Sequence, residues 1–396
     1  MKSEVCSVTP PGWKIRSVEE ICQRVTSGGT PSRGEPAYYV DGRWPWVKTQ
    51  ELQDEWIDDT EEHITEEAVA TSSAKELPRN TVLLAMYGAT VGQLGLLRRP
   101  MTCNQACCAM IVDEETADFR YLFYQLLYAR PQLKSLATGA AQQNLSGVLI
   151  KSLRFPFPHI DEQRAIAHIL GTLDDKIELN RRMNETLEAM ARAIFKSWFV
   201  DTTTSGLPKR WKEGTVGEDF EITMGQSPPG ETYNGIDEGL PFFQGRADFG
   251  FRFPALRVYC TAPTRIANPG DTLVCVRAPV GDVNMAVQQC CVGRGLAAVR
   301  HKTGSRSYTY YAMQALREDF DCFEAEGTVF GSMGKKDFHT ISHVVPPEKK
   351  VKDFETLVNP IDQMIENNEN ESRTLAAIRD ALLPKLLSGE IRVGVN

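Results

Sequence analysis

The chain has 396 residues, of which 42% are hydrophobic and 24% are charged, the composition of a folded protein with room for two domains. No apolar run reaches the ~18 residues that a transmembrane helix needs, and the N-terminus lacks the apolar core of a secretory signal, so we expect a cytoplasmic protein that contacts no membrane. The formal net charge of −8 argues against indiscriminate binding to nucleic acid, so any contact with DNA must rest on local patches.

The ten cysteines predict neither a disulfide framework nor a metal site. They include two adjacent pairs, Cys107–Cys108 and Cys290–Cys291, but no C-x-x-C motif. This pattern is typical of apolar core positions in a protein from a reducing compartment. We therefore expect no bound metal.

The chain divides into four predicted segments. Residues 1–160 form a first domain of short strands and turns, with one helix near residues 119–136. A first long helix follows at 161–200, and a short linker leads to a second domain at 201–345. A second long helix and a C-terminal tail occupy 346–396. The predicted fold class is therefore α+β, with two tandem α/β domains separated by a pair of long helices.

A long internal repeat underlies this division. The segment 138–199 reappears, without a gap, 188 residues later at 326–387. In both copies a Gly-containing turn leads to a proline and then to a long amphipathic helix. Such a period is too long for a solenoid, so the chain is a duplicated domain-plus-helix unit with an internal pseudo-two-fold, which suits a partner with two half-sites. The matching landmarks are Gly139/Gly327, Pro158/Pro346, Asp174/Asp362, Ile177/Ile365, Asn180/Asn368 and Leu187/Leu375.

The long helices carry the pattern of a coiled coil. Their seam residues advance in alternating steps of four and three, and a matching Asn on each helix can fix the register at a cost in stability. Because the linker is short, the second helix must run back along the first, so the pair is antiparallel. The alternative is that each helix packs only on its own domain, but ~39 residues rise ~58 Å, more than a compact domain needs. The predicted seam residues are Ile166, Leu170, Leu173, Ile177, Asn180, Leu187 and Ile194 in the first helix, and Val358, Ile361, Ile365, Asn368, Leu375 and Leu382 in the second.

Catalytic motifs are largely missing from the sequence. It contains no G-x-x-x-x-G-K-[ST], G-x-S-x-G, H-E-x-x-H or G-x-G-x-x-G motif, and no [ND]-P-P-[YF] loop of adenine methyltransferases. Asp337 with Glu348 and Lys350 resembles part of a nuclease site, but the first copy has Ile160-Asp161-Glu162 at the position of 348–350, and acidic residues are common in the first turn of a helix. We therefore expect a chain that is not an enzyme and that binds no cofactor.

Turn segments rich in small, polar and cationic residues recur in both domains. Glycine permits close backbone approach, Ser, Thr and Lys suit phosphates, and Arg and Gln suit the edges of guanine and adenine. Any one of these segments alone is better explained as an ordinary solvated turn. Their recurrence in both domains is what favours DNA binding. The candidate DNA contacts are Ser27, Thr30, Ser32, Arg33, Lys48, Thr49, Tyr87, Thr90, Gln142, Gln143 and Asn144 in the first domain, and Gln226, Ser227, Gln244, Arg246, Arg277, Arg294, Ser332, Lys335 and Lys336 in the second.

Several motifs occur together, in order, within this duplicated frame. They are Pro11-Gly-Trp13, Gly28-Gly-Thr-Pro-Ser32, Trp44-Pro-Trp-Val47, the segments 138–146 and 156–163, Gly225-Gln-Ser-Pro-Pro-Gly230, Pro241-Phe-Phe-Gln-Gly245 and the segment 383–391. On these residues the whole chain resembles the specificity subunit of type I restriction-modification systems. One departure lies at residues 326–331, where Gln142 and Gln143 have no counterparts.

The resemblance implies two target-recognition domains, each reading one half of a bipartite site in double-stranded DNA. It also implies that the helix pair spaces the half-sites and docks two methyltransferase subunits, which use S-adenosylmethionine. Separate restriction/translocase subunits would use ATP and Mg²⁺, so none of this chemistry would belong to the chain itself. The acidic charge leaves open a protein-interaction scaffold that binds no nucleic acid, and a fused nuclease is a third alternative.

Overall fold

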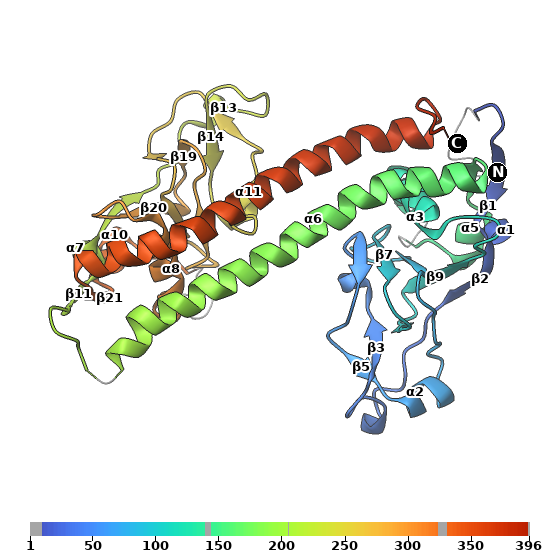
Figure 1. The fold of residues 1–396 in the computed structure, drawn as a ribbon, viewed down its shortest axis with the longest axis horizontal. Coiled ribbons are helices and arrows are strands. Elements are labelled where there is room, and N and C mark those ends of the chain that lie inside the picture. The colour runs from blue at the N-terminus through green and yellow to red at the C-terminus, as the bar shows by residue number, and fades with distance from the viewer. Residues whose placement is uncertain (1–9, 139–143, 205, 324–330, 395–396) are drawn as a thin grey trace. The chain divides into compact units, whose positions relative to one another are not determined.

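The computed structural model describes residues 10–138, 144–204, 206–323 and 331–394. It forms two compact units, one composed of Met1–Glu178 with Ser372–Asn396 and the other of Leu179–Glu371. The chain passes from one unit to the other within each of its long helices, α6 (Ile160–Phe195) and α11 (Glu348–Leu387). Each unit therefore combines a globular part with a stretch of both helices (Figure 1).

The first unit contains a five-stranded sheet in the order β2-β9-β6-β7-β4, a three-stranded sheet β5-β3-β8, and the ribbon β1-β10. Helix α3 packs on the larger sheet, and its Tyr121 and Leu122 are buried in the core. The elements are β1 (Lys14–Ser17), α1 (Val18–Ile21), β2 (Cys22–Ser27), η1 (Pro36–Tyr38), β3 (Trp44–Val47), η2 (Thr49–Glu51), β4 (Glu55–Ile57), β5 (His63–Ile64), α2 (Glu66–Thr71), β6 (Val82–Ala85), β7 (Leu94–Leu97), β8 (Thr102–Cys103), β9 (Cys107–Val112), α3 (Phe119–Tyr128), α4 (Arg130–Thr138), α5 (Gly147–Ser152) and β10 (Arg154–Phe157).

The second unit repeats this topology. Its sheet β12-β20-β17-β18 matches β2-β9-β6-β7, and its parallel pair β14–β19 matches the parallel pair β3–β8. The α+β class predicted from the sequence is confirmed. The elements are β11 (Lys212–Thr215), α7 (Val216–Asp219), β12 (Phe220–Met224), η5 (Gly230–Thr232), β13 (Tyr233–Asn234), β14 (Leu240–Phe243), η6 (Arg246–Asp248), β15 (Tyr259–Cys260), β16 (Ile266–Ala267), β17 (Thr272–Cys275), β18 (Val283–Met285), β19 (Cys290–Val292), β20 (Leu296–His301), α8 (Arg306–Ala315), α9 (Arg317–Asp321), α10 (Lys335–Thr340) and β21 (Ser342–Val345); α6 is followed by η3 (Lys196–Val200) and η4 (Asp201–Thr203).

The two long helices run antiparallel within each unit. In the second unit Phe195 of α6 packs against Phe354 of α11, with ring centres 5.6 Å apart. In the first unit Asp174 of α6 pairs with Arg379 of α11 at 2.7 Å. Every predicted seam residue is buried or half-buried. At their ends the helices also enter the globular cores, so helix-pair packing and packing on each helix's own domain occur together.

Amides occupy the helix pair where a coiled coil would have apolar residues. Asn368 Nδ2 donates to Asn184 Oδ1 at 2.8 Å, and Asn180 Nδ2 donates to Glu371 Oε2 at 2.8 Å. Asn184 Nδ2 in turn donates to Glu369 Oε1 at 3.2 Å. A shift of one helix along the other would break these bonds and leave buried amides without partners, so the network favours a single register.

The adjacent cysteine pairs lie where apolar side chains belong. Cys107, Cys108, Cys290 and Cys291 are all buried free thiols on strands β9 and β19. Burial raises the pKa of Cys290 to about 12. Within the described residues, no helix combines the length and the apolar character that crossing a bilayer requires.

A buried aspartate distinguishes the second unit. Asp219 Oδ1 and Oδ2 accept hydrogen bonds from His301 Nε2 (3.0 Å) and His343 Nε2 (2.9 Å). Burial alone would raise the pKa of Asp219, but the bonds to the two imidazoles outweigh it and lower the pKa to about 2. The carboxylate is thus held in its charged form inside the fold.

Asp219→Asn is expected to lower the free energy of unfolding of the second unit at pH 7 by about 2 kcal/mol. Because the pKa of Asp219 in the folded protein lies below its ordinary 3.8, the carboxylate contributes stability that is present above about pH 4 and lost as the pH falls toward 2. The difference between variant and wild type in urea unfolding should therefore shrink from pH 7 to pH 3. Asp353→Asn, at an exposed position of α11, is the control, and an equal effect of both variants would contradict the assignment.

Candidate nucleic-acid interface

Turns from separate strands converge in the second unit. Gln226 follows β12, Gln244 follows β14, and Arg294 lies in the turn between β19 and β20. The backbone N–H of Arg294 donates to Ser227 Oγ at 3.3 Å, and that of Gln226 donates to the carbonyl of Val292 at 3.0 Å. Candidates that lie far apart in the sequence are therefore neighbours in space.

The loop between β17 and β18 joins these turns. The N–H of Val276 donates to the carbonyl of Gly295 at 2.9 Å, and Arg277 forms an isolated antiparallel bridge with Ser332. Lys335 and Lys336 begin α10 directly after this bridge. We call the segments 226–227, 244–246, 277–279 and 293–295 the turn cluster of the second unit.

The first unit builds the same cluster from segments 27–30, 48–49, 87–90 and 104–105. Thr30 Oγ1 donates to Gln105 Oε1, and the N–H of Asn104 donates to the carbonyl of Val47 at 2.9 Å. Tyr87 forms an isolated bridge with Asn144, as Arg277 does with Ser332. Gln142 and Gln143 lie outside the described residues.

Gln105 is a site residue that the sequence did not reveal. It is exposed and occupies the turn between β8 and β9, the position that Arg294 holds between β19 and β20. Its match to Arg294 follows from the strand order of the two units, because both residues lie outside the repeated segments 138–199 and 326–387. The isolated sequence around Gln105 carries no glycine or cation that draws attention.

The glycines of the cluster serve the fold. A Cβ on Gly28 would lie 2.1 Å from the carbonyl oxygen of Cys103, and a Cβ on Gly225 would lie 2.1 Å from that of Gly293. The close approach that these two glycines permit is to the chain's own neighbouring turn, which draws the cluster together.

Charges are distributed unequally between the two clusters. In the first unit Glu62 pairs with Arg33 (2.7 Å) and with Lys48 (3.0 Å). Burial lowers the pKa of Lys48, but hydrogen bonds to Glu62 and Glu61 outweigh it and raise the pKa. Both candidate cations of the first unit are thus compensated within the protein, and Arg33 also lies 4.5 Å from the ring centre of Tyr39.

The second unit presents uncompensated cations. The side chains of Arg277, Arg294, Lys335 and Lys336 are exposed and form no hydrogen bond or ion pair with another residue in the described part of the chain. Arg246 differs, because it pairs with Asp282. These four side chains concentrate positive charge beside the turn cluster of a chain whose net charge is −8.

The remaining candidates lie in turns. Ser32 is exposed, and its Oγ accepts the N–H of Gly34 at 3.3 Å. Thr49 begins η2, and the carbonyl of Thr90 accepts the N–H of Gln93 at 2.9 Å. Neither threonine is fully exposed.

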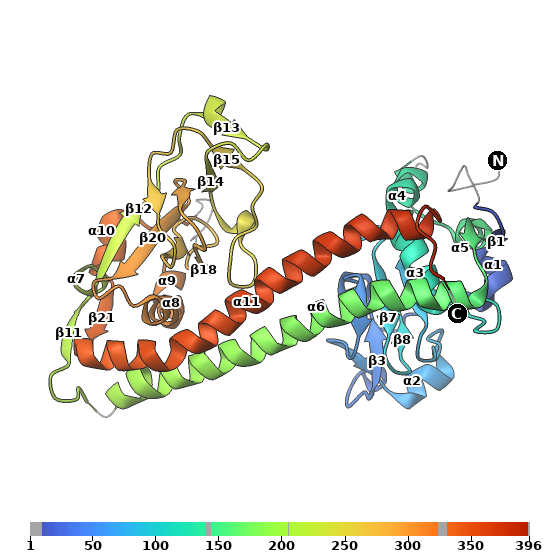
Figure 2. The same ribbon diagram turned by 45° about the horizontal axis from the view of Figure 1, so that its top comes forward.

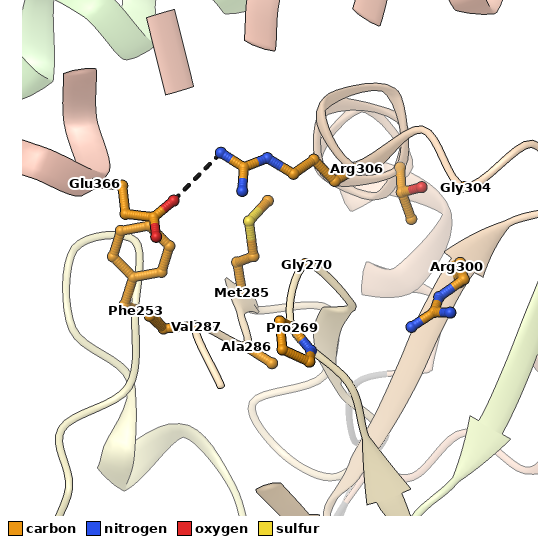
Figure 3. Close-up of a pocket in the computed structure, with 11 residues that line it drawn as sticks. Phe253, Pro269, Gly270, Met285, Ala286, Val287, Arg300, Gly304, Arg306 and Glu366 are labelled. Carbon is orange, nitrogen blue, oxygen red and sulfur yellow. Dashed lines mark hydrogen bonds and ion pairs between the residues drawn. The ribbon is translucent and has the colours of Figure 1, made fainter. Parts of the chain in front are cut away.

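Two pockets lie in the second unit. One pocket of about 570 Å³ is lined by Gln244 and Arg246 together with Tyr233 and Arg257. Another, of about 320 Å³, lies between α8 and α11, where Arg306 pairs with Glu366 at 3.3 Å (Figure 3). No candidate DNA contact lines this second pocket. Among the residues described, no group of three or more His, Cys, Asp or Glu side chains is placed to hold a metal ion.

Comparison with known proteins gives a consistent result. The family model for the type I restriction modification DNA specificity domain matches residues 10–189. The chain is 39% identical to the type I restriction enzyme HindI specificity subunit of Haemophilus influenzae, over 61% of this chain and 70% of that one. It is 26% identical to the putative type I restriction enzyme MjaX specificity subunit of Methanocaldococcus jannaschii, over 99% of this chain and 96% of that one. The crystal structure of an S subunit from Mycoplasma genitalium superposes with a TM-score of 0.62 over 98% of both chains at 18% identity, which shows a shared fold.

Gly225→Ala is expected to destabilise the second unit by about 1–3 kcal/mol, because the new methyl group meets backbone that cannot rotate away. Gly245→Ala is the matched control, since a Cβ there meets nothing within 4 Å. Thermal unfolding of both variants checks the prediction. Equal melting temperatures for the two variants would show that Gly225 is not required for packing.

Proposed function

Because this chain belongs to the family of type I restriction-modification specificity subunits, we propose that it recognises a bipartite sequence in double-stranded DNA and organises a methyltransferase/restriction complex on it. Specificity subunits are non-catalytic, and the chain is accordingly not an enzyme. S-adenosylmethionine, ATP and Mg²⁺ would be used by its partner subunits.

The observation that carries DNA recognition is a set of exposed cations in the second unit, which form no ion pair with any residue that the structure describes. Arg277 and Arg294 lie in turns of the same cluster as Gln244. Lys335 and Lys336 follow shortly after Ser332, the residue that forms a bridge with Arg277. Arginine binds the guanine edge through two hydrogen bonds, glutamine does the same for adenine, and lysine suits phosphates. The cluster thus combines groups that read bases with groups that hold the backbone.

The duplication supports a target of two different halves. The two units share the order of four strands in one sheet and a parallel pair in the other, but the equivalent cluster positions hold Gln105 and Arg294, or Tyr87 and Arg277. The same scaffold with different side chains would read different bases. In this proposal residues 1–160 and 201–345 are the two recognition domains. The helices at 161–200 and 346–396 determine the number of base pairs between the two DNA half-sites, which we call the gap.

The long helices also offer a surface for partner subunits. Leu357 and Met364 lie one heptad apart on α11 within the second unit, and 47% and 48% of their surfaces are exposed. Met190 on α6, which matches Ile378 in the repeat, is 51% exposed. Exposed apolar residues along one side of a helix suit the apolar face of a partner helix. We assign this stripe to docking of two methyltransferase subunits, with restriction/translocase subunits joining the assembly.

A scaffold that binds no nucleic acid is the competing function, favoured by the acidic net charge. Salt separates the two, because binding through phosphates weakens steeply as the salt concentration rises whereas apolar docking does not.

Selection from a random duplex library by the assembled complex should enrich two short motifs separated by a fixed gap. Arg294→Ala is expected to relax one motif at a cost of about 1–3 kcal/mol, and Gln105→Ala should relax only the other. Lys336→Ala should weaken all sequences alike and reduce the salt slope by about 0.9. A single contiguous motif, or equal relaxation of both motifs by Arg294→Ala, would contradict the proposal.

Met364→Glu should reduce co-purification of methyltransferase subunits by about tenfold, because a carboxylate would be buried in an apolar contact. Gln363→Glu adds the same group at an exposed neighbouring position and should leave assembly intact. The enriched half-sites of any complex that still forms should not change. If both variants assemble like the wild type, the stripe is not the docking surface.

A further inference from the structure

Arg252 is a cationic side chain in the interior of the second unit. It belongs to the loop between β14 and β15, and only 1% of its surface is exposed. Its guanidinium lies 3.9 Å from the ring centre of Tyr310. A buried charge is costly unless opposite charges and hydrogen-bond partners surround it with good geometry. The partners of Arg252 therefore indicate its role.

Arg252 binds one carboxylate on each long helix. Nη1 donates to Asp362 Oδ1 of α11 at 2.9 Å, and Nη2 donates to Glu188 Oε2 of α6 at 3.1 Å. Tyr311 of α8 completes the network, since its hydroxyl accepts from Arg252 Nη2 and donates to Asp362 Oδ1, both at 2.9 Å. Arg192 also pairs with Glu188, at 2.7 Å, so that two guanidinium groups face two carboxylates. One side chain of the globular part thus holds both helices.

The backbone of Arg252 connects this network to the turn cluster. The loop that carries Arg252 begins at β14 and includes Arg246. The N–H of Met285 donates to the carbonyl of Arg252 at 2.9 Å, which ties this loop to β18, the strand that follows the Arg277 loop. Movement of Arg252 against the helices would therefore move two segments of the cluster.

In the first unit, the arginine that pairs with the equivalent aspartate comes from a different part of the fold. Tyr124 donates to Asp174 Oδ2 at 2.6 Å, as Tyr311 does to Asp362. The guanidinium on Asp174, however, comes from Arg379 of α11 at 2.7 Å. That cation joins helix to helix, whereas Arg252 joins a loop of the turn cluster to both helices.

We propose that Arg252 is a positioning residue that fixes the turn cluster of the second unit on the long helices and thereby restricts the gap between the two DNA half-sites. The inference rests on the proposed function, because a gap exists only in a bipartite target. One added base pair moves a half-site by ~3.4 Å and turns it by roughly 35°. A cluster held rigidly on the helices accepts one gap, and a cluster released from them also accepts neighbouring gaps.

The test measures gap selectivity of the full-length chain assembled with its methyltransferase subunits. The probes are duplexes that carry both wild-type half-sites, with gaps from two base pairs shorter to two base pairs longer than the selected one. Arg252→Met should lower the preference for the selected gap over its neighbours by about tenfold, with the half-site sequences unchanged. Arg306→Met is the matched control, because it removes an ion pair between α8 and α11 that involves no part of the turn cluster (Figure 3).

Tyr311→Phe removes one hydroxyl and keeps both ion pairs of Arg252, so it should cause a smaller loss of gap preference in the same direction. If circular dichroism shows that Arg252→Met does not fold, the gap preference of Tyr311→Phe tests the positioning role in its place. Weaker binding at every gap with the preference unchanged, or an equal loss of preference in Arg306→Met, would overturn the positioning role. A wild-type complex that selects no second half-site would instead overturn the proposed function on which this role rests.

Discussion

A hydrogen bond from a tyrosine hydroxyl to an aspartate carboxylate joins each globular part to a long helix. Tyr124 binds Asp174 in the first unit and Tyr311 binds Asp362 in the second, at equivalent positions of the repeat. Burial and the neighbouring carboxylate raise the pKa of both tyrosines, so the hydroxyl keeps its proton and remains the donor. Each aspartate is also paired with a guanidinium, which offsets the cost of placing a charge at the joint. Helices α3 and α8, which carry these tyrosines, pack on the sheets whose strands lead into the turn clusters.

The two copies share the parts that give shape and differ in the parts that would contact DNA. Both units place the same turns together, and in both a glycine makes room for a neighbouring backbone, at Gly28 and Gly225. The charges then diverge, because Glu62 pairs with Arg33 and Lys48 in the first unit, whereas Arg277 and Arg294 of the second cluster are exposed. Electrostatic attraction to phosphates would therefore be stronger at the second unit, and hydrogen bonding would matter more at the first. Figure 2 shows the matching strands β3 and β14, each of which is followed by one segment of its cluster.

Features determined by local sequence were predictable, and features that depend on distant partners were not. The seam pattern gave α6 and α11, and small polar residues marked the turns, because periodicity and turn chemistry act over a few residues. Arg252 could not be recognised, since its partners Asp362 and Glu188 lie 110 and 64 residues away. The pairing of Lys48 and Arg33 with Glu62 could not be predicted either, because Glu62 lies in a different turn of the chain. The match of Gln105 to Arg294 likewise depends on the strand order of the two units, since both residues lie outside the repeated segments.

The central claim is that one chain carries two different DNA-reading surfaces on a shared pair of helices. Sequencing that detects methylated adenine, applied to a host genome with and without the gene for this chain, tests it most directly. The account predicts methylation at two half-sites separated by a constant gap, lost entirely when the chain is absent. Methylation of one contiguous motif, or a bipartite pattern that persists without the chain, would contradict it.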